Sequence, residues 1–78
     1  MELEIITPEK ELFNGEVKSV KVPGKSGEFE MLNNHTSIIS TLTNGEIRIV
    51  TMNDKTERFT INGGVVEMLQ NKVIVLAN

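Results

Sequence analysis

The chain has 78 residues, a formal net charge of −3 and no cysteine. This length is typical of one small domain, and we expect residues 1–78 to form a single domain. Without cysteine, the chain has neither disulfides nor thiol chemistry. A nucleic-acid-binding domain usually has a basic stripe or aromatic platforms, whereas this chain is acidic and has three Phe, no Tyr and no Trp. No run approaches the roughly 20 apolar residues that cross a bilayer, so we expect no membrane-inserted segment.

The composition favours β-structure. Eight Val, eight Ile and seven Thr stand against a single Ala. Residues branched at Cβ lose side-chain freedom in helices and pack well on a pleated surface. We therefore expect an all-β domain.

The first part of the chain alternates between apolar and charged residues. Leu3 and Ile5 alternate with glutamates, which predicts a half-buried strand that ends at Thr7-Pro8. The short apolar patch Leu12-Phe13 follows, and Asn14-Gly15 predicts a turn after it.

A second alternating segment leads to a glycine-rich loop. Val20 and Val22 share one face of a strand, and Pro23-Gly24 ends it, because Pro cannot continue the ladder. Val17 is out of phase with these two valines, which predicts a bulge near Lys18-Ser19.

Residues 28–42 predict two further strands. Phe29 and Met31 form an apolar face, and Glu28 and Glu30 project to the opposite side. The segment Thr36–Leu42 is also compatible with a helix, but its Thr, Ser and Ile content favours a strand.

The rest of the chain is divided by turn sequences. Asn44-Gly45 predicts a two-residue hairpin between its flanking strands. Further turns are predicted at Asn53-Asp54-Lys55, Asn62-Gly63-Gly64 and Gln70-Asn71. The pattern predicts seven to ten short strands. Strands of this number and length are expected to form a sandwich or a small barrel.

Few residues could take part in catalysis or metal binding. His35 is the only histidine, and a metal or catalytic site needs partners that the sequence does not supply. The residues Gly24-Lys25-Ser26 resemble part of a phosphate loop, but the first Gly of that motif is missing and no helix is predicted after it. Glu28 and Glu30 would lie side by side on a strand, as solvated charges or as a docking surface for a basic partner. We therefore expect no catalytic residue, no metal ligand and no cofactor.

Several blocks of the sequence together resemble the epsilon subunit family of F-type ATP synthases. His35 belongs to the resemblance, which covers nearly the whole chain in order. The blocks are L-E-I-I-T-P at 3–8, L-F-N-G-E-V at 12–17, V-P-G-K-S-G-E-F at 22–29, L-T-N-G-E-I-R-I-V at 42–50, F-T-I-N-G-G-V-V-E at 59–67 and K-V-I-V-L-A-N at 72–78.

The resemblance implies a fold and a role. The fold is a ten-stranded β-sandwich of two antiparallel sheets, which forms the N-terminal domain of that subunit. The role is non-catalytic. The subunit belongs to the central stalk of the rotor, binds the gamma subunit, rests on the membrane ring of c subunits and supports the coupling of proton flow to ATP synthesis. It is peripheral to the inner (plasma) membrane on the cytoplasmic side, and the isolated chain is expected to be soluble.

The resemblance also implies a surface that faces the ring. In the family, the acidic residue after the loop glycine contacts the polar loop of the c subunit, and here that glutamate is Glu28. The family histidine near this contact corresponds to His35. Two positions depart from the family pattern, because Glu30 stands where a small residue is usual and Asn33-Asn34 stands where a Pro-Gly-like turn is common. The expected ring-facing set is Gly27, Glu28, Glu30, Asn33, Asn34 and His35.

The surface that faces gamma is less defined by the sequence. An exposed apolar patch would mark it, and the candidates are Thr7, Ile38 and Ile39. Many family members continue into a two-helix C-terminal domain that in some binds ATP. This chain stops at Asn78, so we expect no C-terminal helical hairpin and no ATP binding. The alternative function is a free-standing ligand-binding β-sandwich, which would need a groove lined with aromatic residues; an enzyme is a third class, and no residue constellation supports it.

Overall fold

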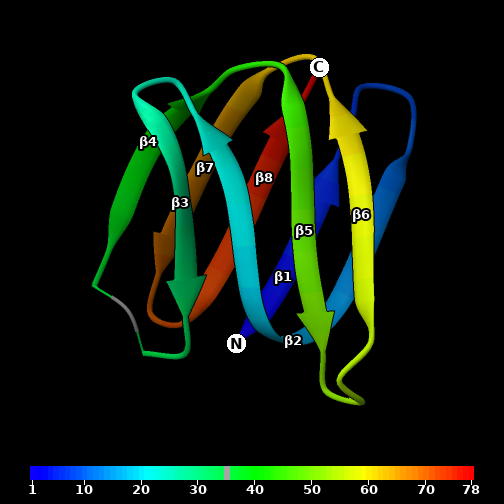
Figure 1. Cartoon of the computed structure of the whole chain (residues 1–78), viewed down its shortest axis with the longest axis vertical. Coiled ribbons are helices and arrows are strands. Elements are labelled where there is room, and N and C mark those ends of the chain that lie inside the picture. The colour runs from blue at the N-terminus through cyan, green and yellow to red at the C-terminus, as the bar shows by residue number, and fades with distance from the viewer. Residues whose placement is uncertain (35) are drawn as a thin grey trace.

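The computed structural model describes residues 1–34 and 36–78 (Figure 1). Within these residues the chain forms eight strands and no helix. In chain order the strands are β1 (Glu2–Ile6), β2 (Glu11–Gly24), β3 (Gly27–Leu32), β4 (Ile38–Leu42), β5 (Gly45–Thr51), β6 (Thr56–Ile61), β7 (Gly64–Leu69) and β8 (Lys72–Ala77).

The strands lie in two facing layers (Figure 1). The front layer contains β3, the second half of β2, β5 and β6, and the back layer contains β4, β7, β8, β1 and the first half of β2. The long strand β2 belongs to both layers, because residues 11–16 pair with β1 and residues 17–24 pair with β3 and β5. The all-β sandwich predicted from the sequence is confirmed. The described residues form eight strands rather than about ten, since one 14-residue strand serves both layers.

One pair of strands departs from the expected antiparallel arrangement. Strand β1 lies parallel to β8, with Leu3 opposite Val73 and Ile5 opposite Val75. Its other edge pairs antiparallel with β2. The expectation of two purely antiparallel sheets is therefore wrong at this pair, because β1 is inserted between the first half of β2 and the last strand.

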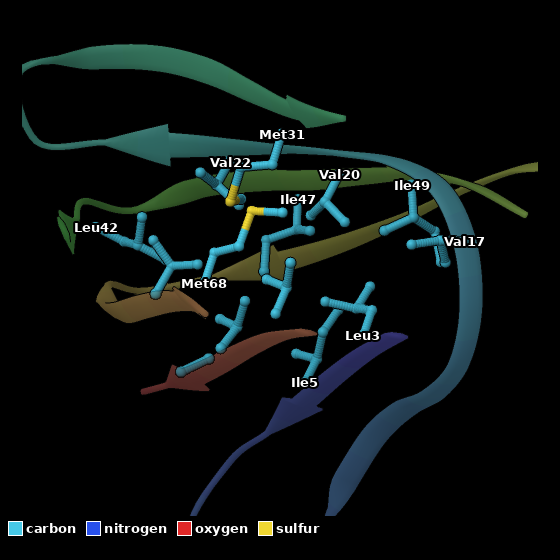
Figure 2. Close-up of a cluster of buried hydrophobic side chains, with 14 of the residues drawn as sticks. Leu3, Ile5, Val17, Val20, Val22, Met31, Leu42, Ile47, Ile49 and Met68 are labelled. Atoms are coloured by element: carbon cyan, nitrogen blue, oxygen red, sulfur yellow. The ribbon is translucent and has the colours of Figure 1, made fainter. Parts of the chain in front are cut away.

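The core fills the space between the layers (Figure 2). Alternate residues of each strand point inward, as the period of two requires. Phe13 and Phe59 pack at the margin of this core with their ring centroids 6.1 Å apart in an edge-to-face arrangement. The buried apolar residues are Met1, Leu3, Ile5, Val17, Val20, Val22, Met31, Leu42, Ile47, Ile49, Ile61, Val66, Met68, Val73, Val75 and Ala77.

The bulge predicted in β2 is confirmed. The register with β5 shifts between Val17 and Ser19, and Val17 and Val20 are both fully buried. An extra residue in a strand bends it and increases its local twist. The bulge thus lies where β2 passes from the back layer to the front layer.

Two turn predictions are wrong. Asn14-Gly15 lies inside β2, opposite Glu4 and Leu3, because β1 supplies partners for a continuous ladder. Asn44-Gly45 does not close a hairpin, because β4 pairs with β7 in the back layer whereas β5 pairs with β2 and β6 in the front layer. A Cβ atom at Gly45 would lie 2.9 Å from Cβ of Pro23. This glycine therefore permits close packing at a crossing between layers.

Two other turn predictions agree with the structure. Gln70 and Asn71 connect β7 to β8 with φ angles of 50° and 63°. Positive φ at both central residues is typical of the tight turns that match the twist of a hairpin. Asn53, Asp54 and Lys55 lie in the connection between the paired strands β5 and β6.

Candidate functional site

The β2–β3 hairpin carries the first group of predicted contact residues. Its strands meet at Gly24 and Gly27, so Lys25 and Ser26 form the loop. The amide of Lys25 donates a hydrogen bond of 2.9 Å to the carbonyl of Thr41 in β4. This bond attaches the tip of the hairpin to the back layer. It thereby helps to position Glu28, the second residue of β3, which lies close to the tip.

Glu28 and Glu30 both project outward from β3 and are exposed. Lys21 of β2 lies opposite Glu30 in the register, and its Nζ is 3.1 Å from Oε1 of Glu28. The two carboxylates predicted to share one face therefore do so, with one lysine between them. Because the side chain of Glu28 is 57% exposed, this ion pair is solvent-screened and contributes little to stability.

The same outer face of the front layer is charged along its width. Lys21 is opposite Arg48 of β5, and Arg48 is opposite Arg58 of β6. Arg58 in turn donates a 3.1 Å hydrogen bond to the carboxylate of Glu46. We call Lys21, Glu28, Glu30, Glu46, Arg48 and Arg58 the charged face.

The structure divides the expected ring-facing set between two places. Gly27 begins β3, whereas Asn33 and Asn34 follow its last residue at the opposite end of the molecule (Figure 1). A six-residue strand is about 20 Å long. His35 lies outside the described residues. Glu28 and the asparagine turn therefore lie near opposite ends of β3, and Glu30 lies between them.

The expected gamma-facing residues have different surroundings. Thr7 organises the β1–β2 turn, where its hydroxyl donates to the carbonyl of Lys10 (2.9 Å) and accepts from the amide of the same residue (3.1 Å). Ile38 points inward and packs against the core. Ile39 points outward and is 71% exposed. Of the three, only Ile39 has a largely exposed apolar side chain.

Ile39 is part of a larger apolar surface on the outside of the back layer. In the register, Thr41 of β4, Val65 of β7 and Leu76 of β8 form one row, and Ile39, Glu67 and Ile74 form the next. Exposed fractions are 40% for Val65, 56% for Leu69 and 55% for Leu76. We call Ile39, Val65, Leu69, Ile74 and Leu76 the apolar face.

Most of the apolar face was not predicted from the sequence. A sequence signal for it exists, because Val73-Ile74-Val75-Leu76 and Val65-Val66 are consecutive apolar residues in strands. Such runs place apolar side chains on both sides of a sheet. Alternation alone assigns only one side to the core and does not reveal what covers the other.

The described residues provide no evidence for chemistry at a pocket. Two open grooves, of about 490 and 530 Å³, have none of the three Phe in their linings. All three Phe pack against the core instead. Residues 1–34 and 36–78 contain no group of three or more metal-ligating side chains, and no helix among them is long and apolar enough to cross a membrane.

Comparison with protein families gives one match that covers the chain. A family model described as the β-sandwich domain of the ATP synthase delta/epsilon chain matches residues 1–78.

Proteins similar to the chain in sequence include ATP synthase epsilon chains. The chain is 45% identical over 78 residues to that of Aliarcobacter butzleri, with 100% of this chain and 62% of the relative covered. It is 46% identical over 76 residues to that of Sulfurimonas denitrificans, with 97% and 58% covered. The chain therefore spans about three fifths of the length of these relatives.

Solved structures with the same fold come from large assemblies. A chain in the Euglena gracilis mitochondrial ATP synthase F1/c-ring structure superimposes with a TM-score of 0.89 and 18% identity, covering 96% of this chain and 48% of that one. A chain in the Tetrahymena thermophila mitochondrial ATP synthase central stalk/c-ring structure gives 0.81 and 18%, covering 97% and 61%. At this identity the likeness concerns the fold.

Proposed function

The chain belongs to the ATP synthase delta/epsilon chain β-sandwich family, and from this premise we propose that it is a non-catalytic subunit of the central stalk. In this role residues 1–78 act as one β-sandwich domain that links the gamma subunit to the membrane c ring of a proton-translocating F-type ATP synthase. The names of its relatives support the assignment. The domain helps to fasten the rotor, so that rotation of the ring is transmitted to gamma.

The observation that carries the proposal is the contrast between the two outer faces of the sandwich. The back layer has the apolar face and the front layer has the charged face. A domain that works alone would gain nothing from several exposed apolar side chains on one sheet, whereas a domain held between two partners uses such a sheet for docking. The two faces differ enough to bind two different proteins.

The apolar face is the proposed contact with gamma. Glu67 lies in its middle, between Ile39 and Ile74 in the register. A partner that covers this surface must leave that carboxylate in water or pair it, since an unpaired buried charge is costly. We therefore expect gamma to present apolar side chains around one Lys or Arg that meets Glu67.

The front end of β3 is the proposed contact with the ring. Gly27 and Glu28 lie there, Glu30 follows near the middle of the strand, and both carboxylates are exposed. They could pair with basic residues on the polar loops of the c subunits, which would set orientation and association rate more than affinity. Asn33, Asn34 and His35 were predicted for the same contact. Because the turn of Asn33 and Asn34 is at the far end of β3, it would serve as a second, separate contact.

The gamma contact can be tested by calorimetry together with size-exclusion chromatography on the purified gamma subunit. We expect a one-to-one complex with a negative heat-capacity change, the mark of buried apolar surface. Ile39→Ser and Leu76→Ser should each weaken binding by about 1–2 kcal/mol, or roughly 5–30-fold. Leu32→Ser is the matched control, because Leu32 is 53% exposed on β3 of the front layer. Equal losses for all three variants would contradict the assignment of the apolar face.

The ring contact can be tested by charge reversal in the assembled complex. Glu28→Lys and Glu30→Lys should reduce proton pumping driven by ATP in membrane vesicles. Glu9→Lys makes the same change in net charge in the exposed β1–β2 turn and should leave pumping unchanged. Normal pumping in both β3 variants would refute the ring contact without affecting the gamma contact.

Within such a complex, the chain would lie peripheral to the inner (plasma) membrane on its cytoplasmic side. The proposal includes no cofactor and no ATP binding by residues 1–78. Titration with ATP followed by calorimetry tests this, and micromolar binding would refute it. A ligand-binding sandwich, the alternative function, is not favoured, because the Phe side chains pack against the core and line neither of the two grooves.

A further inference from the structure

The charged face contains a cation that no described residue neutralises. Lys21 is paired with Glu28 and Arg58 is paired with Glu46, in each case with the nitrogen and oxygen 3.1 Å apart. Arg48 lies between the two paired cations and directly opposite each of them in the register. Within the described part of the chain, its side chain makes neither a hydrogen bond nor an ion pair.

The position of Arg48 is unfavourable for the free domain. Like charges that lie directly opposite each other on one face of a sheet destabilise it, and Arg48 has such a neighbour on both sides. The Arg48 side chain is only partly exposed, so water and salt screen these repulsions incompletely. Local arrangements that cost stability are expected at binding sites more than elsewhere.

Glu30 is a second charge without a partner in the same row. Lys21 lies opposite Glu30 on one side and opposite Arg48 on the other, since β3, β2 and β5 are adjacent in the front layer (Figure 1). The ammonium group of Lys21 contacts Glu28 instead, and the exposed Glu30 side chain has no hydrogen bond or ion pair with any described residue. Because neighbouring strands are about 4.8 Å apart, the backbones at Glu30 and Arg48 are roughly 10 Å apart.

We propose that Glu30 and Arg48 bind one basic and one acidic side chain of the polar loops of the c ring, and so fix the orientation of the domain on the ring. This inference rests on the ring contact proposed above and adds an acidic group to the partner. The planar guanidinium fork binds a carboxylate through two parallel hydrogen bonds. A pair of opposite charges sets orientation more than affinity, because the exchanged arrangement brings like charges together.

The composition of the charged face favours a protein partner over a phosphate group or an anionic membrane. The carboxylates of Glu28, Glu30 and Glu46 lie on the same outer face as the three cations. They would repel a surface that carries only negative charge. A loop with both signs of charge satisfies Glu30 and Arg48 at once.

The test measures the affinity of the full chain for gamma alone and for gamma bound to the c ring, both in the same detergent. Arg48→Met keeps an unbranched side chain and removes the charge. It should weaken binding to the gamma–ring complex about tenfold and leave binding to gamma unchanged. Glu30→Gln should do the same. Lys55→Met, which removes a cation from the exposed connection between β5 and β6, is the matched control and should change neither affinity.

The direction of the Arg48→Met effect separates the possible partners. A purely basic partner would bind this variant more tightly, because a repelling cation is gone. That result, or an unchanged affinity, would overturn the proposal and leave the ring contact standing. If the ring adds no affinity to that of gamma for the unaltered chain, the ring contact itself fails and the inference with it. Binding of the unaltered chain to phosphatidylglycerol vesicles that Arg48→Met abolishes, with ring binding unchanged, would assign Arg48 to a membrane and also overturn the proposal.

Thermal unfolding tests whether Arg48 is kept at a cost to stability. Arg48→Met should raise the melting temperature by roughly 1–5 °C, since it removes two like-charge neighbours. A fall would contradict the argument that Arg48 is retained for binding. Arg48→Lys keeps the charge without the planar fork, so it should bind the gamma–ring complex about threefold more weakly. Undiminished binding by this variant would refute a bidentate carboxylate contact.

Discussion

Replacement of Met31 by alanine should loosen the strand that carries Glu28 and Glu30. The Met31 side chain is fully buried, and Figure 2 shows it pointing into the core toward Met68 of the facing layer. Burial of a methionine and the cavity left by its removal together cost about 2–5 kcal/mol. Within the described residues β3 pairs with β2 alone, so it can move inward, and we expect the lower half of this range, about 2–3 kcal/mol.

This loss is large for a domain of this size. Stability of roughly 0.05–0.15 kcal/mol per residue gives about 4–12 kcal/mol for the whole chain. The melting temperature should therefore fall by roughly 10–20 °C. Urea unfolding followed by far-ultraviolet circular dichroism measures the change, because the chain has no Trp or Tyr for fluorescence.

Two variants control the Met31 experiment. One replaces Met31 by a side chain of similar volume, and the other truncates the neighbouring residue, Leu32. Met31→Leu keeps the volume and should cost less than about 1.5 kcal/mol. Leu32→Ala removes the same number of heavy atoms from the next position, which is 53% exposed, and should cost less than about 1 kcal/mol. If Met31→Ala costs no more than Leu32→Ala, the view that Met31 holds β3 to the core is wrong.

Two further substitutions test the packing and the charges. Gly64 has a φ of 143°, and a Cβ atom there would lie 2.1 Å from a carbonyl oxygen of β8, so Gly64→Ala should cost at least about 2 kcal/mol in thermal unfolding. Gly15→Ala, where the nearest atom would be at 3.4 Å, should change stability by less than about 1 kcal/mol, and equal effects would refute the distinction. Lys21→Met removes the 3.1 Å contact with Glu28 and should cost less than about 1 kcal/mol in urea unfolding at low and at high salt. A loss above 2 kcal/mol would mean that this exposed pair is structural.

The strands and the inward faces could be predicted from the sequence wherever alternation was clear. Leu3 and Ile5, and likewise Val20 and Val22, point to the core as expected. The out-of-phase Val17 correctly indicated the bulge. These features are local, because the period of two is a property of each strand by itself.

Connections between strands were harder to predict. Asn44-Gly45 and Gln70-Asn71 both indicated a turn, yet only the second closes a hairpin. Glycine is favoured at two kinds of position, those with a positive φ and those where another part of the chain packs closely against the backbone. The sequence alone does not distinguish the two. At Gly45 the need is close packing against Pro23, which comes from a distant part of the chain.

The candidate surfaces could be predicted only in part. Glu28 and Glu30 share a face as predicted, since their spacing decides this. Asn33 was grouped with them through the family resemblance, but it follows the last residue of β3, at the opposite end of the strand from Gly27 and Glu28. The side chain of Asn71 donates a hydrogen bond to the side chain of Asn33. This bond joins segments far apart in the chain, and no local pattern indicates it.

The parallel pairing of β1 with β8 has a consequence for how the chain folds. Leu3 pairs with Val73, which is 70 residues further along the sequence, so one edge of the first strand stays unpaired until β8 has been synthesised. Contacts of such high sequence separation are formed late, since loop closure costs entropy before the contact is gained. We expect folding on the scale of about milliseconds to seconds, as for other β-proteins rich in distant pairings. Until β8 pairs, the nascent domain exposes an open sheet edge, which is a target for chaperones and for aggregation.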